Sequence, residues 1–411
     1  MIRASAISYA IVFALFIGLL ASSVFFIFSA QKRIEFVHTS QEHLLLDSYQ
    51  GIQLGLQQVK VNDSLQFVHE SGDTSIIHKS IWGSYYLVTS QTFKNERSVN
   101  RSALIGSEFE GSLPALVIRS GSDGLRICGE TFIEGAVYLP NKRVELAYIG
   151  GKNYSNPELV YGEINDSKDL KLNLSTHFGN VSPKDFVGNL NPTAYSWKDT
   201  SISFLENGAY YQSLDPIQIR SKFRGKIIIQ SFDSLVVYKE AQLTNVILIA
   251  PKIYIKQGFS GNLQALASES IVLEDSVTLS YPSTLILNEH AASTNYKPHS
   301  VYLGANSSVL GGVLLTTQQY DFRKQPKLTI QKNSVIAGVV FNCGISEVYG
   351  SIIGSLNTGE TLTLAGGGSY TNHLLDAIIS TKRLPQDFVC PAWFEFSGYS
   401  RKKIISCELE S

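Results

Sequence analysis

The sequence predicts a mainly β protein attached to one N-terminal transmembrane helix. Three observations support this fold class: an uncharged apolar run near the start, a composition that favours strands, and a short apolar pattern that recurs along the chain. Only 17% of the 411 residues are charged, whereas Tyr and Phe occur 20 and 21 times. Aromatic and β-branched side chains fit the pleated surface of a sheet. We expect a transmembrane helix extended by an amphipathic arm, a small β-hairpin region, and a single-stranded parallel β-helix (a solenoid) with a C-terminal cap.

The apolar run begins after Arg3 and continues without a charge to Lys32. It exceeds the roughly 20 residues that a helix needs to cross the hydrocarbon core of a bilayer. A cleaved signal peptide would have a shorter apolar region, about 7–15 residues, followed by a small-x-small cleavage site. Here the bulky Phe28 occupies the first position of the nearest such site, Phe28-Ser29-Ala30. The sequence therefore predicts an uncleaved, single-pass anchor.

An amphipathic arm is expected to follow this run, so that the first region covers residues 1–60. Apolar residues recur there at helical spacing, and no proline interrupts residues 4–60. The apolar positions of the arm are Phe36, Leu44, Leu45, Tyr49, Ile52, Leu56 and Val59. Two forms fit this pattern equally: one continuous helix, or a membrane helix followed by a short packing helix.

The opening Arg3-Ala4-Ser5-Ala6 and the unbroken apolar helix resemble the N-termini of accessory proteins that accompany type IV pilins in bacteria (minor pseudopilin-like proteins). The resemblance covers about the first 60 residues, which contain neither the Gly-Phe junction nor the early glutamate of true prepilins. It implies a single-pass protein of the bacterial inner membrane, with envelope or pilus-like assembly proteins as partners. The C-terminal domain would lie in the periplasm or outside the cell, which also suits a β domain with disulfides.

Residues 61–124 are predicted to form a β-hairpin or capping region. The segment Trp82–Thr89 is strand-like, KNERS at 94–98 reads as a turn, and Ala103–Gly106 closes the next strand. Because a solenoid needs its ends covered, we expect residues 74–124 to cap one end of the predicted β-helix.

The β-helix prediction, for residues 125–369, depends on an internal repeat. Six apolar or small positions recur at identical spacing in three segments that begin at Leu125, Val301 and Leu328. Gly135, Gly311 and Gly338 occupy the same place in each, as expected where a bend needs an unusual φ or where no side chain fits. Short strands repeated every 20–30 residues are typical of solenoids. An antiparallel sandwich also alternates, but it would not explain the matched glycines.

The repeat pattern resembles bactofilins, which are small bacterial β-helix polymers, and the β-helices of polysaccharide lyases. Residues 150–225 match the repeat poorly and contain several prolines, so we expect an irregular insertion there. Residues 370–411 are expected to form a C-terminal capping tail. The apolar spacing from Leu374 to Ile379 suggests a short helix within it.

The four cysteines form no CxxC pair, so a zinc site is not predicted. An even number outside the cytoplasm permits two disulfides, Cys390–Cys407 and Cys128–Cys343. The alternative is that all four are reduced residues packed as small apolar groups.

No catalytic, cofactor-binding or metal-binding residue is predicted. The only adjacent acidic pair within the repeat is Glu274-Asp275, and acidic residues are common in such turns. His38 and His43 are five residues apart, a poor spacing for two ligands on one helix face, and His290 and His299 are expected on the surface. The chain has no G-x-S-x-G elbow, Walker A loop or dinucleotide fingerprint. A Ser-His-Asp triad stays open, because its members meet only in the fold.

The formal net charge of -1 gives no global attraction to nucleic acid, and no cofactor is implied. The expected function is that of a non-enzymatic, membrane-anchored structural, assembly or adhesion module outside the cytoplasm, such as an accessory subunit of a pilus-like or secretion apparatus. Its partners would be the membrane, envelope proteins and glycans. The alternative is a membrane-tethered, polysaccharide-active enzyme on the same fold. Grouped carboxylates in one groove would favour this alternative.

Overall fold

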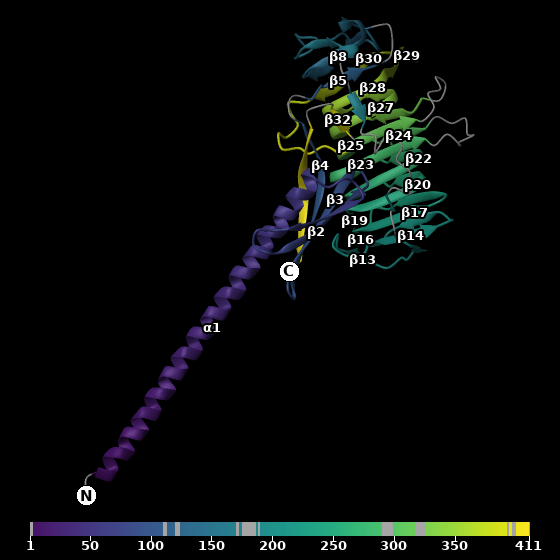
Figure 1. Ribbon diagram of the computed structural model, residues 1–411. Helices are drawn as coiled ribbons and strands as arrows, with labels where there is room; N and C mark the ends of the chain where they lie inside the picture. Colours follow the sequence, from purple (N-terminus) through teal and green to yellow (C-terminus); the bar gives the residue numbers. More distant parts are fainter. Residues whose placement is uncertain are drawn as a thin grey trace.

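The computed structural model describes residues 3–109, 113–119, 124–169, 172–174, 186–187, 190–289, 299–317, 325–392, 394–396 and 400–410. It is mainly β, with one long apolar helix at the N-terminus, which confirms the predicted fold class at that level. Figure 1 shows the helix projecting from one side of a tall β domain.

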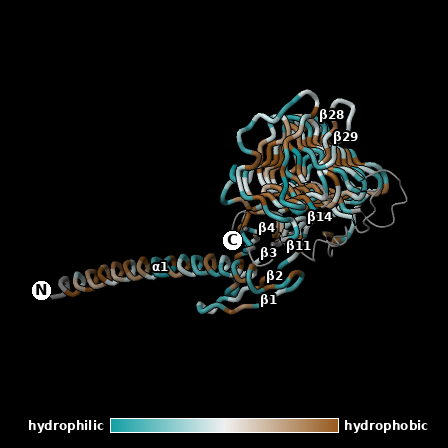
Figure 2. The backbone as a smooth tube through the Cα atoms, turned by 90° about the horizontal axis from the view of Figure 1, so that it is seen from above, coloured by the Kyte–Doolittle hydropathy of each residue, from teal (hydrophilic) through white to brown (hydrophobic). Residues whose placement is uncertain are grey.

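Helix α1 (Arg3–Gln57) is continuous over 55 residues. At a rise of 1.5 Å per residue it is about 80 Å long. The predicted arm is thus an extension of the apolar N-terminal helix and not a separate packing helix. Figure 2 shows that the N-terminal part of the helix is mostly hydrophobic and that polar residues increase toward the β domain.

An antiparallel sheet receives the C-terminal end of α1. Its order is β1-β2-β3-β4-β33, so the last strand of the chain pairs with β4. The turn predicted at 94–98 joins β3 to β4, whereas Gly83 and Ser84 interrupt the segment that was expected to be one strand from Trp82 to Thr89. The strands of this sheet are β1 (Asp63–Val68), β2 (Thr74–Trp82), β3 (Tyr85–Lys94), β4 (Arg97–Phe109) and β33 (Ser400–Glu410).

The remaining strands form mostly one closed parallel sheet, called here the parallel stack. The parallel stack also includes the hairpin strand β29, which is antiparallel to β28. Its members are β5 (Leu116–Ile118), β7 (Phe132–Glu134), β8 (Val137–Leu139), β10 (Ile164–Asp166), β12 (Pro192–Ala194), β14 (Ala209–Ser213), β15 (Ile217–Ile219), β17 (Ile227–Ser231), β18 (Ser234–Val237), β20 (Val246–Ile255), β21 (Ser260–Gly261), β22 (Leu263–Leu273), β23 (Thr278–Glu289), β24 (Ser300–Leu303), β25 (Ser308–Thr317), β26 (Lys327–Ile330), β27 (Val335–Val348), β28 (Ser351–Ala365), β29 (Gly368–Thr371) and β31 (Ile378–Ser380).

Three small sheets and two short 3-10 helices complete the described secondary structure. The sheets consist of β30 (His373–Leu375), β6 (Leu125–Cys128) and β9 (Val144–Leu146); β13 (Thr200–Ile202), β16 (Lys222–Gly225) and β19 (Gln242–Thr244); and β11 (Leu172–Leu174) with β32 (Phe394–Phe396). The 3-10 helices are η1 (Pro140–Lys142) and η2 (Ser167–Asp169).

Strands of the parallel stack pair so that like side chains lie above one another. One buried ladder passes through ten strands and joins Ile229, Leu248, Ala265, Leu285, Val313, Val340, Leu356, Leu116, Val137 and Ile164. All except Ile164 are buried. Short strands of three to five residues are stable here because each stacks on neighbours that bury its apolar face.

The order of this ladder shows that the chain does not climb the stack from one end to the other. Strands β5 to β10 lie at the end of the stack where β28 and β31 also lie, and β12 and β14 lie at the opposite end (Figure 1). Leu116 of β5 pairs with Leu356 of β28, although 240 residues separate them. The first strands of the stack along the chain, β5 to β10, therefore form one end, and β12 and β14 form the opposite end. The later strands fill the layers between them until β28 pairs with β5.

This path corrects four expectations. The irregular insertion was placed as far as residue 225, but β14, β15 and β16 already belong to stacked layers. The expected helix at 374–379 is wrong, because β30 and β31 occupy it and Leu374, Ala377 and Ile379 all face the core. Residues 74–124 were expected to cap one end, but β2, β3 and β4 pack against the side of the stack and β5 is itself one of its strands. The C-terminal tail is not a cap either, since β33 returns to the antiparallel sheet.

The repeat copies that begin at Val301 and Leu328 stack directly on each other, with Gly311 opposite Gly338. Gly338 in turn pairs with Gly354. All three glycines, and Gly135 of the first copy, have φ between +124° and +143°. A Cβ atom at Gly338 would collide with the carbonyl oxygen of Gly311. The column formed by the stacked glycines Gly311, Gly338 and Gly354 therefore has both an unusual backbone conformation and no room for side chains.

Candidate functional site

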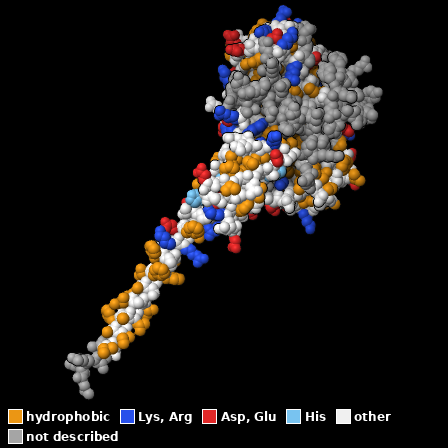
Figure 3. Space-filling view, in the orientation of Figure 1, with side chains coloured by type: hydrophobic (Ala, Val, Ile, Leu, Met, Phe, Trp, Pro, Cys, Tyr) orange, Lys and Arg blue, Asp and Glu red, His pale blue; other side chains and the backbone are white. Residues whose placement is uncertain are grey.

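The N-terminal part of α1 is the most exposed apolar surface among the described residues. From Ile7 to Phe36 its large apolar side chains are each more than half exposed, for example Phe25 at 74%. Figure 3 shows these side chains covering the free half of the helix, with charged side chains appearing toward the β domain. It is the one described helix long and apolar enough to cross a membrane. An exposed apolar surface of this size marks a site of contact with a membrane or with another protein.

The C-terminal part of α1 is embedded in the β domain. Leu44 and Ile52 are completely buried against the antiparallel sheet. Two glycines let the helix approach closely: a Cβ atom at Gly55 would lie 2.5 Å from Val88 Cγ1 and 3.0 Å from Ile77 Cγ2. Gly51 lies in the same way against Ser90 and Ser75. Because the helix is continuous, this junction fixes the direction in which the exposed apolar half of α1 leaves the domain.

Truncating the junction should therefore loosen the whole domain. We expect Ile52→Ala to lower the free energy of unfolding by about 2–4 kcal/mol, because the methyl groups leave a cavity in a packed core. Leu46→Ala, on the exposed side of the same helix at 67% exposure, should change it by less than about 0.5 kcal/mol. Chemical denaturation of the full-length protein in detergent would measure both. Equal effects would show that the helix does not depend on this packing.

A polar cluster lies in the same junction and was not recognised in the sequence. His69 Nε2 is 2.7 Å from Ser75 Oγ, and His69 Nδ1 lies 3.1 Å from Gln50 Oε1 and 3.5 Å from Asp47 Oδ1. Ser75 Oγ is also hydrogen-bonded to Thr92 Oγ1 at 2.6 Å. The residue types and order of contact are those of a Ser-His-Asp triad. No sequence motif surrounds them, because Asp47 lies on α1, His69 lies between β1 and β2, and Ser75 lies on β2.

Burial decides what this cluster can do. Ser75 is 0% exposed and His69 is 4% exposed, so a substrate cannot reach the serine hydroxyl. A nucleophile also needs a free position for the reacting carbonyl beside it, and Thr92 fills that space. The cluster instead satisfies the polar groups that the close helix–sheet approach buries. It links α1 to β2 and β3 and reinforces the junction.

The acidic pair Glu274-Asp275 is bound to neighbouring turns. Glu274 Oε1 accepts a hydrogen bond from Lys256 at 2.6 Å, and Glu274 Oε2 accepts one from the backbone nitrogen of Gln257. Asp275 Oδ1 accepts one from the backbone nitrogen of Ala305 at 2.8 Å. The hydrogen bond from Lys256 lowers the pKa of Glu274. A general acid at neutral pH needs a raised pKa, so this carboxylate is poorly suited to that task.

The structure contains neither of the two predicted disulfides, because none of the four cysteines is disulfide-bonded. Cys390 lies opposite Ser107 on β4, whereas Cys407 lies opposite Ala103. Four residues along a strand correspond to about 13 Å, well beyond the usual 4.4–6.8 Å between the Cα atoms of a disulfide. Cys128 is buried in β6 and donates to the carbonyl of Leu374, while Cys343 is in β27. Burial raises the pKa of the Cys390 thiol.

The other sequence-based site expectations are quickly placed. His299 is 3% exposed, which corrects the expected surface position; His290 lies outside the described residues. His38 is exposed on α1 near Glu42. Over the ranges that the structure describes, no three His, Cys, Asp or Glu side chains come together in a way that could hold a metal ion.

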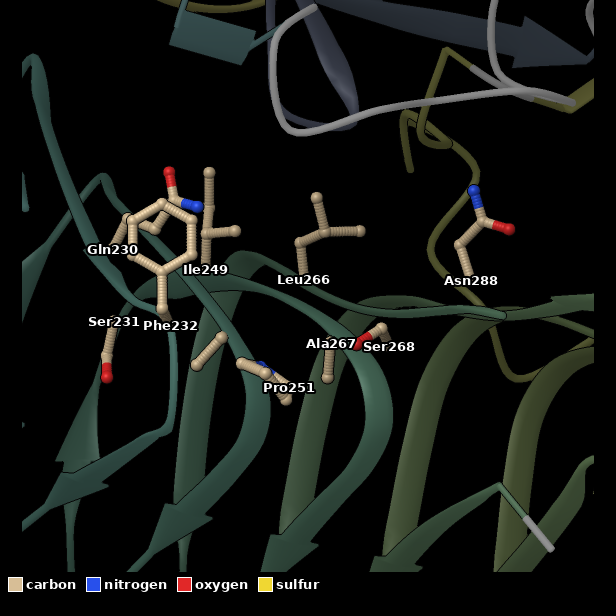
Figure 4. Close-up of a pocket in the computed structure, with 10 residues that line it drawn as sticks. Gln230, Ser231, Phe232, Ile249, Pro251, Leu266, Ala267, Ser268 and Asn288 are labelled. Carbon is tan, nitrogen blue, oxygen red and sulfur yellow. The ribbon is translucent and has the colours of Figure 1, made fainter. Parts of the chain in front are cut away.

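The parallel stack carries a hollow at the corner where its strands leave the face that the antiparallel sheet covers (Figure 4). This corner pocket has a volume of about 200 Å³. Its lining comes from four successive strands or the turns that follow them: Gln230, Ser231, Phe232, Ile249, Ala250, Pro251, Leu266, Ala267, Ser268 and Asn288. The described lining is mostly apolar and includes no titratable side chain, so these residues offer no acid or base.

Comparison with known proteins gives little further guidance. No protein-family model and no curated protein matches the chain. Among solved structures, the chain is similar to the competence-associated pilin ComZ from Thermus thermophilus, with 12% identity over 86% of this chain and 87% of that one. The TM-score of that superposition is 0.21, a value too low to support any conclusion about a shared fold or function.

Proposed function

We propose that this protein is a single-pass, membrane-anchored assembly subunit of the bacterial envelope, an accessory to a pilus-like or secretion apparatus. In this proposal the N-terminus lies in the cytoplasm and the β domain lies in the periplasm or outside the cell. The observation that carries it is the division of α1: its N-terminal part is exposed and apolar, and its C-terminal part is buried in the β domain. The sequence resemblance to pilin-like accessory proteins supports the same reading.

The proposal treats the parallel stack as a parallel β-helix. The in-register ladders and the column of Gly311, Gly338 and Gly354 support this interpretation, since stacked coils repeat the same side chain at the same place. A β-helix joined to a membrane helix by a buried junction is a rigid body with a large lateral surface. Such a body suits a subunit that positions other proteins at a defined distance from the membrane.

In-cell photo-cross-linking tests the assembly role. A photoreactive residue replacing Phe25, which is 74% exposed on the free part of α1, should give an adduct with another membrane-anchored envelope protein. The same residue at Leu46, beyond the apolar run, should give less of that adduct because it lies outside the bilayer. A chain that yields only monomer at both positions, and at the exposed Tyr148 that follows β9, would contradict the proposal.

The second candidate, a polysaccharide-active enzyme, predicts a different outcome at Glu274-Asp275. We expect the full-length protein to leave neutral and acidic polysaccharides intact. We also expect the double variant Glu274→Gln, Asp275→Asn to lose only about 1–2 kcal/mol of stability from its turn hydrogen bonds. General acid–base groups contribute roughly 10²–10⁴-fold each. Cleavage of a glycan by the wild-type chain that disappears in the double variant would therefore favour the enzyme.

A further inference from the structure

The corner pocket has a fixed hydrogen-bond donor. Gln230 is 8% exposed, and its Oε1 accepts a hydrogen bond from the Tyr210 hydroxyl at 2.5 Å. Because that bond engages the oxygen, the group that this lining side chain can offer to a ligand is its amide nitrogen, with two hydrogens. Within the described part of the chain, this nitrogen has no acceptor. This nitrogen is not one of the fully buried polar atoms that lack a partner, so it is accessible, and a ligand that brings an acceptor oxygen can accept a hydrogen bond from it.

An aromatic ring stands beside this donor. Phe232 is 50% exposed and forms one wall of the pocket next to Gln230 (Figure 4). Ala250, Pro251 and Ala267 contribute small side chains to the lining. A half-exposed ring beside small side chains can accept a flat apolar surface. The pocket thus combines a planar apolar contact with a hydrogen-bond donor at its edge.

The charge of the lining and the size of the corner pocket further restrict the class of ligand that can bind. Among the described lining residues there is no Lys, Arg, Asp, Glu or His, so a charged ligand would lose hydration without gaining an ionic partner from them. The volume of about 200 Å³ is below the roughly 300–1,000 Å³ of sites for drug-sized ligands. It therefore accommodates one ring and not an extended chain.

We propose that the corner pocket binds one neutral sugar residue of a glycan. A pyranose ring has an apolar C–H face, which would stack on Phe232. It also carries hydroxyl oxygens at its rim, which would accept a hydrogen bond from the Gln230 amide. An apolar peptide side chain would fill the hollow but would leave the Gln230 donors without an acceptor. This inference goes beyond the proposed assembly role and does not depend on it.

The test uses the full-length protein in a sugar-free detergent, with glucose, galactose, mannose and N-acetylglucosamine as probes. Saturation-transfer NMR and titration should detect binding of at least one of them, with a dissociation constant on the order of 1 mM. Phe232→Ala should weaken it at least about tenfold, because the stacking surface is lost. Gln230→Glu keeps an acceptor for Tyr210 but removes the donors, and should weaken binding about tenfold as well.

Two further variants make the result decisive. Phe232→Trp retains a flat ring and should bind as well as the wild type or more tightly. Tyr148→Ala removes an aromatic side chain that is 68% exposed but outside the pocket, and should change nothing. The proposal is overturned if no probe binds, or if Phe232→Ala binds like the wild type. It is also overturned if N-acetyl-leucine amide binds at Phe232 and the sugars do not.

Discussion

Replacing Gly338 with alanine should destabilise the β domain by about 3–5 kcal/mol, a large part of the total stability of a typical domain. Two costs add. Gly338 has φ +143°, which L side chains rarely adopt. A Cβ atom there would also collide with the backbone of Gly311 and approach Phe388. Neither neighbour can move easily, because Gly311 belongs to the adjacent layer of the stack and Phe388 packs with Tyr281.

Gly72→Ala is the matched control for this variant. Gly72 has φ +82° in a turn, and nothing lies within 4 Å of the Cβ position. It therefore shares the backbone strain but not the collision, and should lose only about 1 kcal/mol. Urea unfolding of both variants, in the full-length chain, separates the two costs. Equal losses of the free energy of unfolding would mean that backbone strain alone explains why position 338 is a glycine. The close stacking of the layers would then contribute nothing.

Placing two arginines in the free half of α1 should abolish membrane anchoring. Each arginine near the centre of a membrane helix costs about 2.5–3.5 kcal/mol on insertion scales, so Ile17→Arg with Leu20→Arg should prevent stable insertion. Both side chains are more than half exposed in the protein, so the β domain itself should still fold. Alkaline extraction should then release the variant, whereas the wild type should stay in the membrane fraction.

Leu46→Arg provides the control on the same helix. Leu46 is 67% exposed but lies beyond the apolar run, so its substitution should leave the membrane fraction unchanged. A periplasmic reporter fused after Ser411 should be active in this variant and in the wild type, and inactive when anchoring fails with the domain left in the cytoplasm. Recovery of the wild type as a shortened soluble chain would instead identify a cleaved signal sequence.

The local sequence pattern was sufficient to predict a helix or strand where one face of that element meets a single kind of environment. The uncharged run from Ala4 to Gln31 predicted α1, because bilayer thickness and helix rise alone set the requirement. Alternation at Val301, Leu303, Val309 and Val313 predicted strands with one buried face, and these residues are all buried. Local pattern failed at Leu374, Ala377 and Ile379, where a turn between short strands produces nearly the same apolar spacing as a helix.

The sequence by itself determined the apolar membrane segment, the β-rich composition and the recurring glycine position, because each depends on residues close together in the chain. Only the tertiary structure decided that β5 stacks on β28, that β33 returns to β4, and that Asp47, His69 and Ser75 meet in a buried cluster. It also decided that Cys390 and Cys407 lie too far apart to form a disulfide. These contacts join segments separated by up to hundreds of residues, and parallel strands of similar apolar pattern could pair with many neighbours. The choice among them is made by closure of one common core, which no local pattern records.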